Sequence, residues 1–274
     1  MSGTNNVQAG QTAPSSAAAT HGTLTSGLAA ADTDNVLGVS GVAWKSRILP
    51  IQVLGDDGLG DTVSVALGIR FAVDYGARII NMSLGSSEND PLVSEQVDYA
   101  LAHNVVVVAA AGNDGCDCIS YPGNYPGVIA VGASTSTDTR ASFSSYGANL
   151  ALLAPGTSTI CSTAWSVAQP TSLYSCGYSG TSFSSPVTAG AAALLLAQNP
   201  NLTPSQVKSA LTSTATKVSG MNGQNFTTTY GYGRLNVYDA LKSVSLRAPD
   251  GGVVNTHSAS LAAISGIYRP QMNS

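Results

Sequence analysis

The chain has 274 residues, of which 43% are hydrophobic and only 9% are charged, and its formal net charge is −4. It has no basic block and no basic–aromatic run, so we expect no nucleic-acid partner. Its longest apolar run, around residues 105–111, is far too short to span a bilayer, so we expect no membrane partner. The first twenty residues lack the positive and apolar regions of a signal peptide.

In chain order, the apolar patterns alternate between helices and strands. We expect helices over residues 21–31, 62–75, 91–103, 187–197, 204–212 and 237–244, and strands over residues 48–54, 78–82, 105–110, 128–131 and 150–153. Residues 158–161 and 173–178 are expected to pair as a hairpin. This alternation predicts an α/β protein with a mainly parallel sheet flanked by helices. Residues 1–20 show no hydrophobic period and are expected to be disordered or truncated, and residues 245–274 are expected to be a linker or C-terminal extension.

Ser182 stands at or just before the first turn of the most apolar predicted helix. That helix has no charge on any face, so we expect it in the middle of the domain. A serine hydroxyl at the positive end of a buried helix suits a nucleophile and the anion that develops beside it. The same position also suits a helix N-cap, and the helix alone does not decide between these interpretations.

Two further side chains are candidates for chemistry. His21 opens a predicted helix of small residues, which allow a substrate to approach closely. Asn113 follows the predicted strand 105–110, and ligands of open α/β sheets bind beyond the carboxyl ends of strands. An amide there can donate to an oxyanion, although an asparagine in a glycine-flanked turn is also common.

Three segments in this order resemble the motifs of subtilisin-like serine proteases, the subtilases. They are residues 21–27 (HGTLTSG), 110–113 (AAGN) and 180–186 (GTSFSSP), and the resemblance extends from about residue 21 to residue 244. It implies a three-layer subtilisin-like fold, with residues 21–244 as the catalytic domain. It also implies a serine endopeptidase in which Ser182 is the nucleophile, His21 the general base and acid, and Asn113 the oxyanion donor. Such an enzyme needs no cofactor for its chemistry.

The resemblance also implies where a polypeptide substrate would lie. It would add as an extended strand between two backbone edges, with a third segment forming the wall of a side-chain pocket. The two edges are Ser83, Leu84 and Gly85, and Gly58, Leu59 and Gly60; the wall is Ala110, Ala111 and Gly112. We further expect a secreted protein, because members of this family are secreted. We also expect a monomer.

One family feature is absent: no Asp or Glu precedes His21, where subtilases carry their catalytic aspartate. Three explanations are open. The chain is a fragment, or a degenerate relative that binds peptides without cutting them, or an unrelated acid serves. Asp32 cannot easily serve, because eleven residues along a helix separate it from His21 by roughly 16 Å, whereas Asp34, Asp56, Asp57 or Asp61 could fold back from their loops. We favour the fragment, because the remaining motifs are intact. A sheet without the strand that bears this aspartate would have a gap and an exposed edge.

Two structural features are also expected. By resemblance, a structural calcium would be bound by Asn35 and the carbonyls of Leu37 and Val39. Cys161 and Cys176 flank a fourteen-residue loop in the predicted hairpin, so a disulfide between them is plausible. For Cys116 and Cys118, direct pairing would be strained, and free or separately paired thiols are as plausible.

Overall fold

The computed structural model describes residues 17–158, 160–165, 172–245 and 260–265. The helices are α1 (Ala17–Ala30), α2 (Thr62–Asp74), α3 (Pro91–Ala102), α4 (Thr181–Gln198), α5 (Pro204–Ser213), the short 3₁₀ helix η1 (Ser219–Met221) and α6 (Val237–Val244). The strands are β1 (Arg47–Ile51), β2 (Ile79–Ser83), β3 (Val106–Ala110), β4 (Ile129–Ser134), β5 (Leu150–Pro155), β6 (Ile160–Thr163), β7 (Tyr174–Tyr178) and β8 (Ser260–Ser265). The helices and strands predicted before residue 245 all form, with ends displaced by a few residues.

Six strands form one parallel sheet in the order β1-β8-β2-β3-β4-β5. Strands β2 and β3 are buried along their whole length. Strands covered on both faces read as continuous apolar runs, which is the pattern of the 105–110 segment. The two remaining strands, β6 and β7, form a separate antiparallel hairpin.

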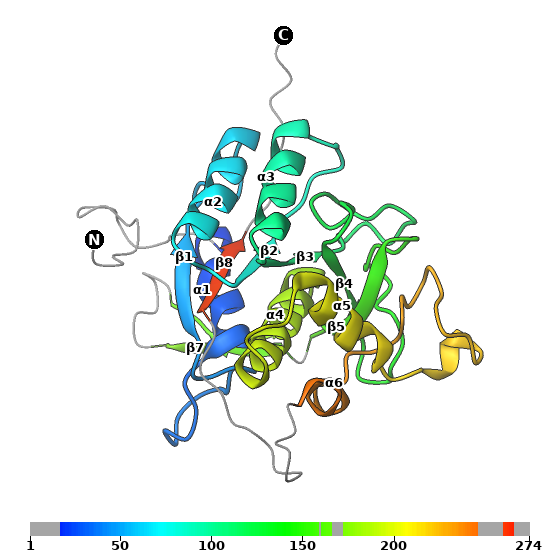
Figure 1. Cartoon of the computed structure of the whole chain (residues 1–274). Coiled ribbons are helices and arrows are strands. Elements are labelled where there is room, and N and C mark those ends of the chain that lie inside the picture. The colour runs from blue at the N-terminus through cyan, green and yellow to red at the C-terminus, as the bar shows by residue number, and fades with distance from the viewer. Residues whose placement is uncertain (1–16, 159, 166–171, 246–259, 266–274) are drawn as a thin grey trace.

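Strand β8 comes from the C-terminal extension and lies inside the sheet. It pairs with β1 from Arg47↔Ser260 to Ile51↔Ile264 and with β2 from Ile79↔Leu261 to Ser83↔Ser265. Figure 1 shows it in red between β1 and β2, beside the blue α1. The expected gap between these strands is therefore not present, because a segment distant in sequence pairs with the backbone groups of both neighbours.

Helices cover both faces of the sheet and produce a three-layer architecture (Figure 1). One apolar core joins α2 and α3 to the sheet and contains Ile69, Val97 and Ile80. The other joins the sheet to α4, α5 and α6 and contains Leu195 and Leu211. Within the described residues, no helix combines the length and apolar character that a membrane crossing requires.

Local sequence determines where the helices begin. Asp61 and Asp90 accept hydrogen bonds from the first-turn backbone of α2 and α3. Thr203 and Gln206 form a reciprocal capping box at α5. Helix α4 differs, because its N-cap, Gly180, provides no side-chain cap.

Candidate active site

The carboxyl edge of the sheet and the N-terminus of α4 meet at the candidate site. Ser83 ends β2, and Ala111, Gly112 and Asn113 follow β3. Ser182 is the second residue of α4. This is the position where open α/β sheets bind their ligands.

Asn113 provides the cap that α4 lacks. Its Oδ1 accepts a hydrogen bond from the backbone N–H of Thr181 at 2.9 Å and lies 3.0 Å from Thr181 Oγ1. Thr181 is fully buried, and its Oγ1 also accepts from the Gly112 N–H at 3.2 Å. These contacts fix the amide oxygen of Asn113, so its Nδ2 is left to donate to another group. No pattern in the sequence predicted the contribution of Thr181.

Ser83 fixes the backbone of Ser182 from the sheet side. Its Oγ donates to the Ser182 carbonyl at 2.8 Å, lies 2.8 Å from Ser185 Oγ and accepts from Asn81 Nδ2 at 3.0 Å. The first turn of α4 is therefore tied to β2 as well as to Asn113. Within the described residues, the Ser182 hydroxyl itself has no hydrogen-bond partner.

His21 lies on α1 next to the same helix. Its ring centroid is 5.7 Å from that of Phe183, which neighbours Ser182 in sequence. The Nδ1 atom is buried and has no hydrogen-bond partner in the described part of the chain. Burial away from water lowers the pKa of His21 from 6.5 to about 4, so its imidazole is neutral at pH 7.

None of the five acids weighed above forms a hydrogen bond with Nδ1 of His21. Asp61 accepts from the backbone and hydroxyl of Ser64, and this hydrogen bonding lowers its pKa. Asp57 accepts from the Leu59 N–H, and Asp32 accepts from the Thr33 N–H. Among the described residues, no carboxylate therefore bonds to Nδ1 to select the tautomer of the imidazole.

The three expected substrate segments lie at the same edge of the sheet. Residues 83–85 continue from β2, residues 110–112 from β3, and residues 58–60 follow β1 before α2 begins. Gly112 has φ +109°, and a Cβ there would lie 2.5 Å from Ser120 Oγ. Leu59 is 44% exposed, whereas Leu84 is buried.

The expected calcium loop is an exposed turn. The Oδ1 of Asn35 accepts a hydrogen bond from the Leu37 N–H at 3.2 Å, and Leu37 is itself exposed. The described residues contain no group of three or more His, Cys, Asp or Glu side chains that could hold a metal ion. Calcium binding at Asn35, Leu37 and Val39 stays a prediction.

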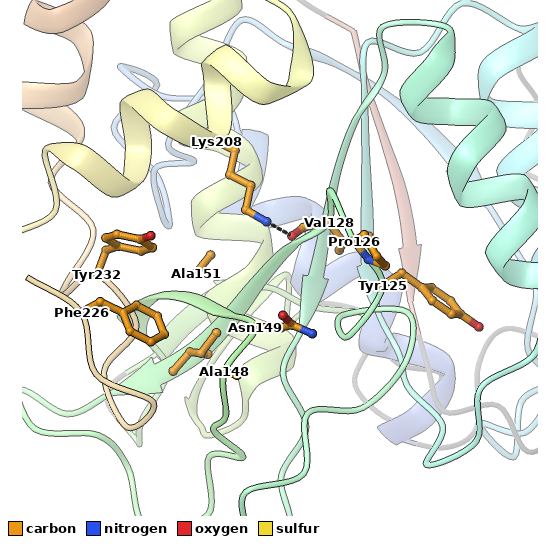
Figure 2. A pocket seen from close by; sticks show the side chains of 10 residues that line it. Tyr125, Pro126, Val128, Ala148, Asn149, Ala151, Lys208, Phe226 and Tyr232 are labelled. Carbon is orange, nitrogen blue, oxygen red and sulfur yellow. Dashed lines mark hydrogen bonds between the residues drawn. The ribbon is translucent and has the colours of Figure 1, made fainter.

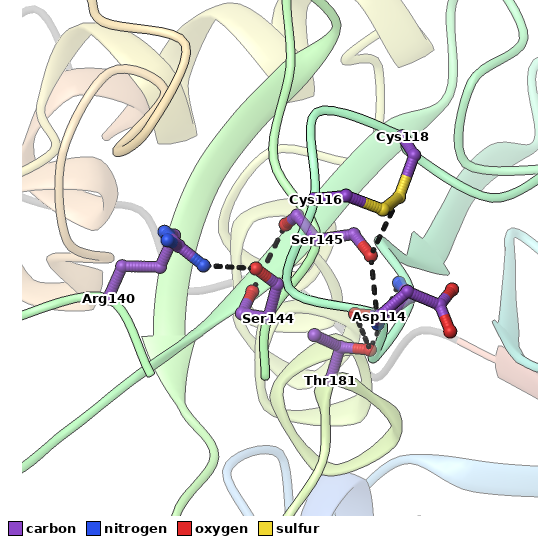
Figure 3. Close-up of a disulfide and its surroundings, with 8 residues drawn as sticks. Asp114, Cys116, Cys118, Arg140, Ser144, Ser145 and Thr181 are labelled. Carbon is purple, nitrogen blue, oxygen red and sulfur yellow. Dashed lines mark hydrogen bonds between the residues drawn. A yellow bond between two sulfur atoms is a disulfide. The ribbon is translucent and has the colours of Figure 1, made fainter. Parts of the chain in front are cut away.

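Both pairs of cysteines form disulfides. Cys161 joins Cys176 across the β6–β7 hairpin. Cys116 joins Cys118 directly, in the loop after Asn113, and this loop is anchored by Ser145 (Figure 3). The Oγ of Ser145 accepts from the Asp114 N–H at 3.2 Å and lies 3.7 Å from the sulfur of Cys118.

A cavity of about 270 Å³ lies away from these residues. Its lining includes residues just before β4 and β5, so it is at the amino edge of the sheet, together with Phe226 and Tyr232. Figure 2 shows Lys208 reaching from α5 to donate to the Val128 carbonyl at 2.8 Å. Burial lowers the pKa of Lys208. The cavity has no part in the Ser182 site.

Comparison with known proteins agrees with the geometry. The model of the subtilase family of peptidases matches residues 2–233. The chain belongs to the subtilase family. By family it is a subtilisin-like serine endopeptidase, a class that acts on polypeptides.

Similar subtilases are found among both sequences and structures. Subtilisin DY of Bacillus licheniformis is 44% identical, over 79% of this chain and 76% of the relative. Thermitase of Thermoactinomyces vulgaris is 40% identical, over 81% and 75%. Among solved structures, a protease of Pseudoalteromonas arctica PAMC 21717 matches with a TM-score of 0.74 at 34% identity, covering 82% of this chain and 71% of that one.

Proposed function

We propose that this subtilase cleaves peptide bonds through Ser182, His21 and Asn113. The observation that carries the proposal is the pair of contacts between Asn113 Oδ1 and Thr181, at 2.9 Å and 3.0 Å. They direct the amide oxygen toward the helix and leave Nδ2 as a donor beside the first turn of α4. A preorganised donor of this kind stabilises the oxyanion of acyl transfer.

The chemistry follows from these three residues. Ser182 Oγ attacks the carbonyl carbon of the substrate while His21 accepts the hydroxyl proton, and the carbonyl oxygen becomes an oxyanion facing Asn113 Nδ2. The tetrahedral intermediate expels the amine, which receives the proton from His21. Water then attacks the acyl-enzyme by the same steps, and Ser182 is regenerated. Because burial keeps His21 neutral, the imidazole is available as a base.

The substrate is an extended polypeptide that adds as a strand between residues 83–85 and 58–60. Both segments follow the carboxyl ends of strands, residues 83–85 after β2 and residues 58–60 after β1, and an extended peptide can pair with backbone of this kind. The wall formed by residues 110–112 would contact the side chain before the cleaved bond. We further propose that the protein is a secreted monomer that uses no cofactor in catalysis.

A second candidate function is peptide binding without turnover. It is favoured by the buried Nδ1 of His21, which has no acceptor among the described residues. A neutral imidazole without this acceptor has no group that keeps its proton on Nδ1, and the tautomer with a free Nε2 is the one that accepts the serine proton. Loss of the acceptor costs about 10⁴ in turnover in the chymotrypsin-type triad.

A fluorophosphonate probe distinguishes these functions, because it reacts with an activated serine and requires no chosen substrate. We expect intact mass spectrometry to show one added probe per chain, and the Ser182→Ala variant to show none. If the folded wild-type protein remains unlabelled but binds a peptide, binding without turnover is the correct function. Labelling that persists in Ser182→Ala would place the reactive group elsewhere.

A further inference from the structure

The β6–β7 hairpin contacts the helix that carries His21. Ser162 Oγ donates to the Leu24 carbonyl at 2.6 Å, and Thr163 Oγ1 donates to the Thr23 carbonyl at 2.9 Å. Ser162 is completely buried. Both acceptors lie within one turn of His21, so these two hydroxyls fix the part of α1 that sets the position of the imidazole.

The approach of the hairpin to α1 is close. A Cβ at Gly27 would lie 2.1 Å from Thr163 Oγ1 and 2.5 Å from Ser162 Oγ. Real Cβ contacts are never this short, so only glycine permits the helix and the strand to come so near at this point. The two hydrogen bonds to α1 depend on this spacing.

Aromatic rings extend the contact to His21 itself. Tyr178 on β7 packs against Phe183 with ring centroids 5.4 Å apart, and Phe183 packs against His21. Leu24 and Ile160 complete a small apolar cluster with Phe183. The hairpin therefore reaches the imidazole indirectly, through Phe183 of α4.

The Cys161–Cys176 disulfide closes the hairpin immediately beside Ser162. The two cysteines are partners in the β6–β7 ladder, and Ser162 is opposite Ser175 in the next pair. This covalent link keeps β6, which carries Ser162 and Thr163, close to β7, which carries Tyr178.

We propose that the β6–β7 hairpin positions His21 for catalysis, with Ser162 and Thr163 as positioning residues and the Cys161–Cys176 disulfide as the link that holds them in place. This proposal rests on the proposed function, in which His21 is the general base. Because Nδ1 has no hydrogen-bond partner among the described residues, the contacts that place the ring are the hydrogen bonds to α1 and the packing against Phe183.

The test compares Ser162→Ala with Ser175→Ala. Both remove one hydroxyl from the same hairpin, but the Ser175 hydroxyl makes no hydrogen bond within the described residues. Nuclear magnetic resonance titration of His21 reports the ring without requiring activity, and fluorophosphonate labelling reports the reaction. In Ser162→Ala, we expect the pKa of His21 to rise by about half a unit or more toward 6.5 and the labelling rate to fall about fivefold. Ser175→Ala should change neither.

A second pair of variants extends the test to the disulfide. Replacing Cys161 and Cys176 together by Ala should raise the His21 pKa, whereas replacing Cys116 and Cys118 together should not, because that loop is anchored by Ser145 rather than α1. If Ser162→Ala does not fold, Thr163→Val removes the second hydroxyl with little change of shape.

The outcomes separate this proposal from the proposed function. Unchanged titration of His21 in the folded hairpin variants would overturn the positioning role, even if the wild type is labelled. An equal change in Ser175→Ala would do the same. A wild-type chain that is never labelled, but whose His21 titration responds to Ser162→Ala, would refute the catalytic function and leave the positioning contact intact.

Discussion

The two halves of the active site are constrained in different ways. The Ser182 half is fixed by polar contacts, because Asn113, Thr181 and Ser83 join the first turn of α4 to two strands of the sheet. The His21 half has apolar packing and two hydrogen bonds to its helix backbone, while the Nδ1 of the ring itself has no partner within the described residues.

This difference indicates how each half responds to change. A polar network loses function when one donor or acceptor is removed, because the remaining groups stay buried and unpaired. A packed ring responds to changes in the shape and hydration of its surroundings. Variants of the two halves should therefore differ in their effects, and removal of β8 should affect the sheet itself.

Removal of β8 should have the largest effect. A chain ending at Ser245 loses the strand between β1 and β2, so both neighbours expose unpaired backbone edges. We expect the free energy of unfolding to fall by more than about 3 kcal/mol, measured by urea denaturation. A chain ending at Ser265 retains β8 and is the matched control. Equal stability of the two truncated chains would show that β8 does not support the sheet.

Asn113→Ala should have the next largest effect, and it should act on the Ser182 half alone. We expect peptide turnover to fall about 10²–10³-fold, the loss known for a single oxyanion donor in subtilisin, a member of this family. The pKa of His21 should stay near 4. Asn201→Ala, on an exposed loop, is the control. A small loss in Asn113→Ala would mean that another group stabilises the oxyanion.

Thr181→Val should produce a smaller loss in the same half. The variant removes the hydroxyl contact with Asn113 Oδ1 but retains the backbone N–H that donates at 2.9 Å. We expect a loss of about 1 kcal/mol in transition-state stabilisation, seen in kcat with KM unchanged. A loss of turnover in Thr181→Val as large as that in Asn113→Ala would show that the Thr181 hydroxyl alone orients the amide.

The burial of His21 should be detected most clearly in the pH dependence of the free energy of unfolding. The pKa of His21 is about 4 in the folded chain and 6.5 in the unfolded chain, so between these values only the unfolded chain binds the proton. The free energy of unfolding should therefore decrease as the pH falls from 6.5 to 4, by up to about 3 kcal/mol. His21→Gln should remove this part of the decrease. An identical pH profile in the variant would contradict the burial of the ring.

Much of the fold could be predicted from the sequence, because its elements have strong local patterns. The uncharged run of α4 and the apolar run of β3 predicted buried elements, and the strand before Asn113 predicted that this side chain lies at the carboxyl edge of the sheet. Strand β8 was not predicted, since six residues in a segment without sustained period carry little local information. Its position depends on the backbone edges of β1 and β2, which are distant in sequence.

The contacts that orient the site were also beyond prediction. Ser162 and Leu24 are separated by 138 residues, so no local pattern connects them. The sequence shows that no acid precedes His21. Whether a later acid reaches the ring depends on tertiary packing, and Asp32, Asp57 and Asp61 all bond to their own loops instead.

The central claim is that a buried, neutral His21 activates Ser182. The most direct test is the rate of fluorophosphonate labelling measured from pH 8 down to pH 3, with circular dichroism to confirm folding at each pH. The account predicts labelling that persists below pH 6 and declines with an apparent pKa of about 4. An apparent pKa near 7 would contradict it, because it would require an anion beside the imidazole, and so would the absence of labelling at every pH.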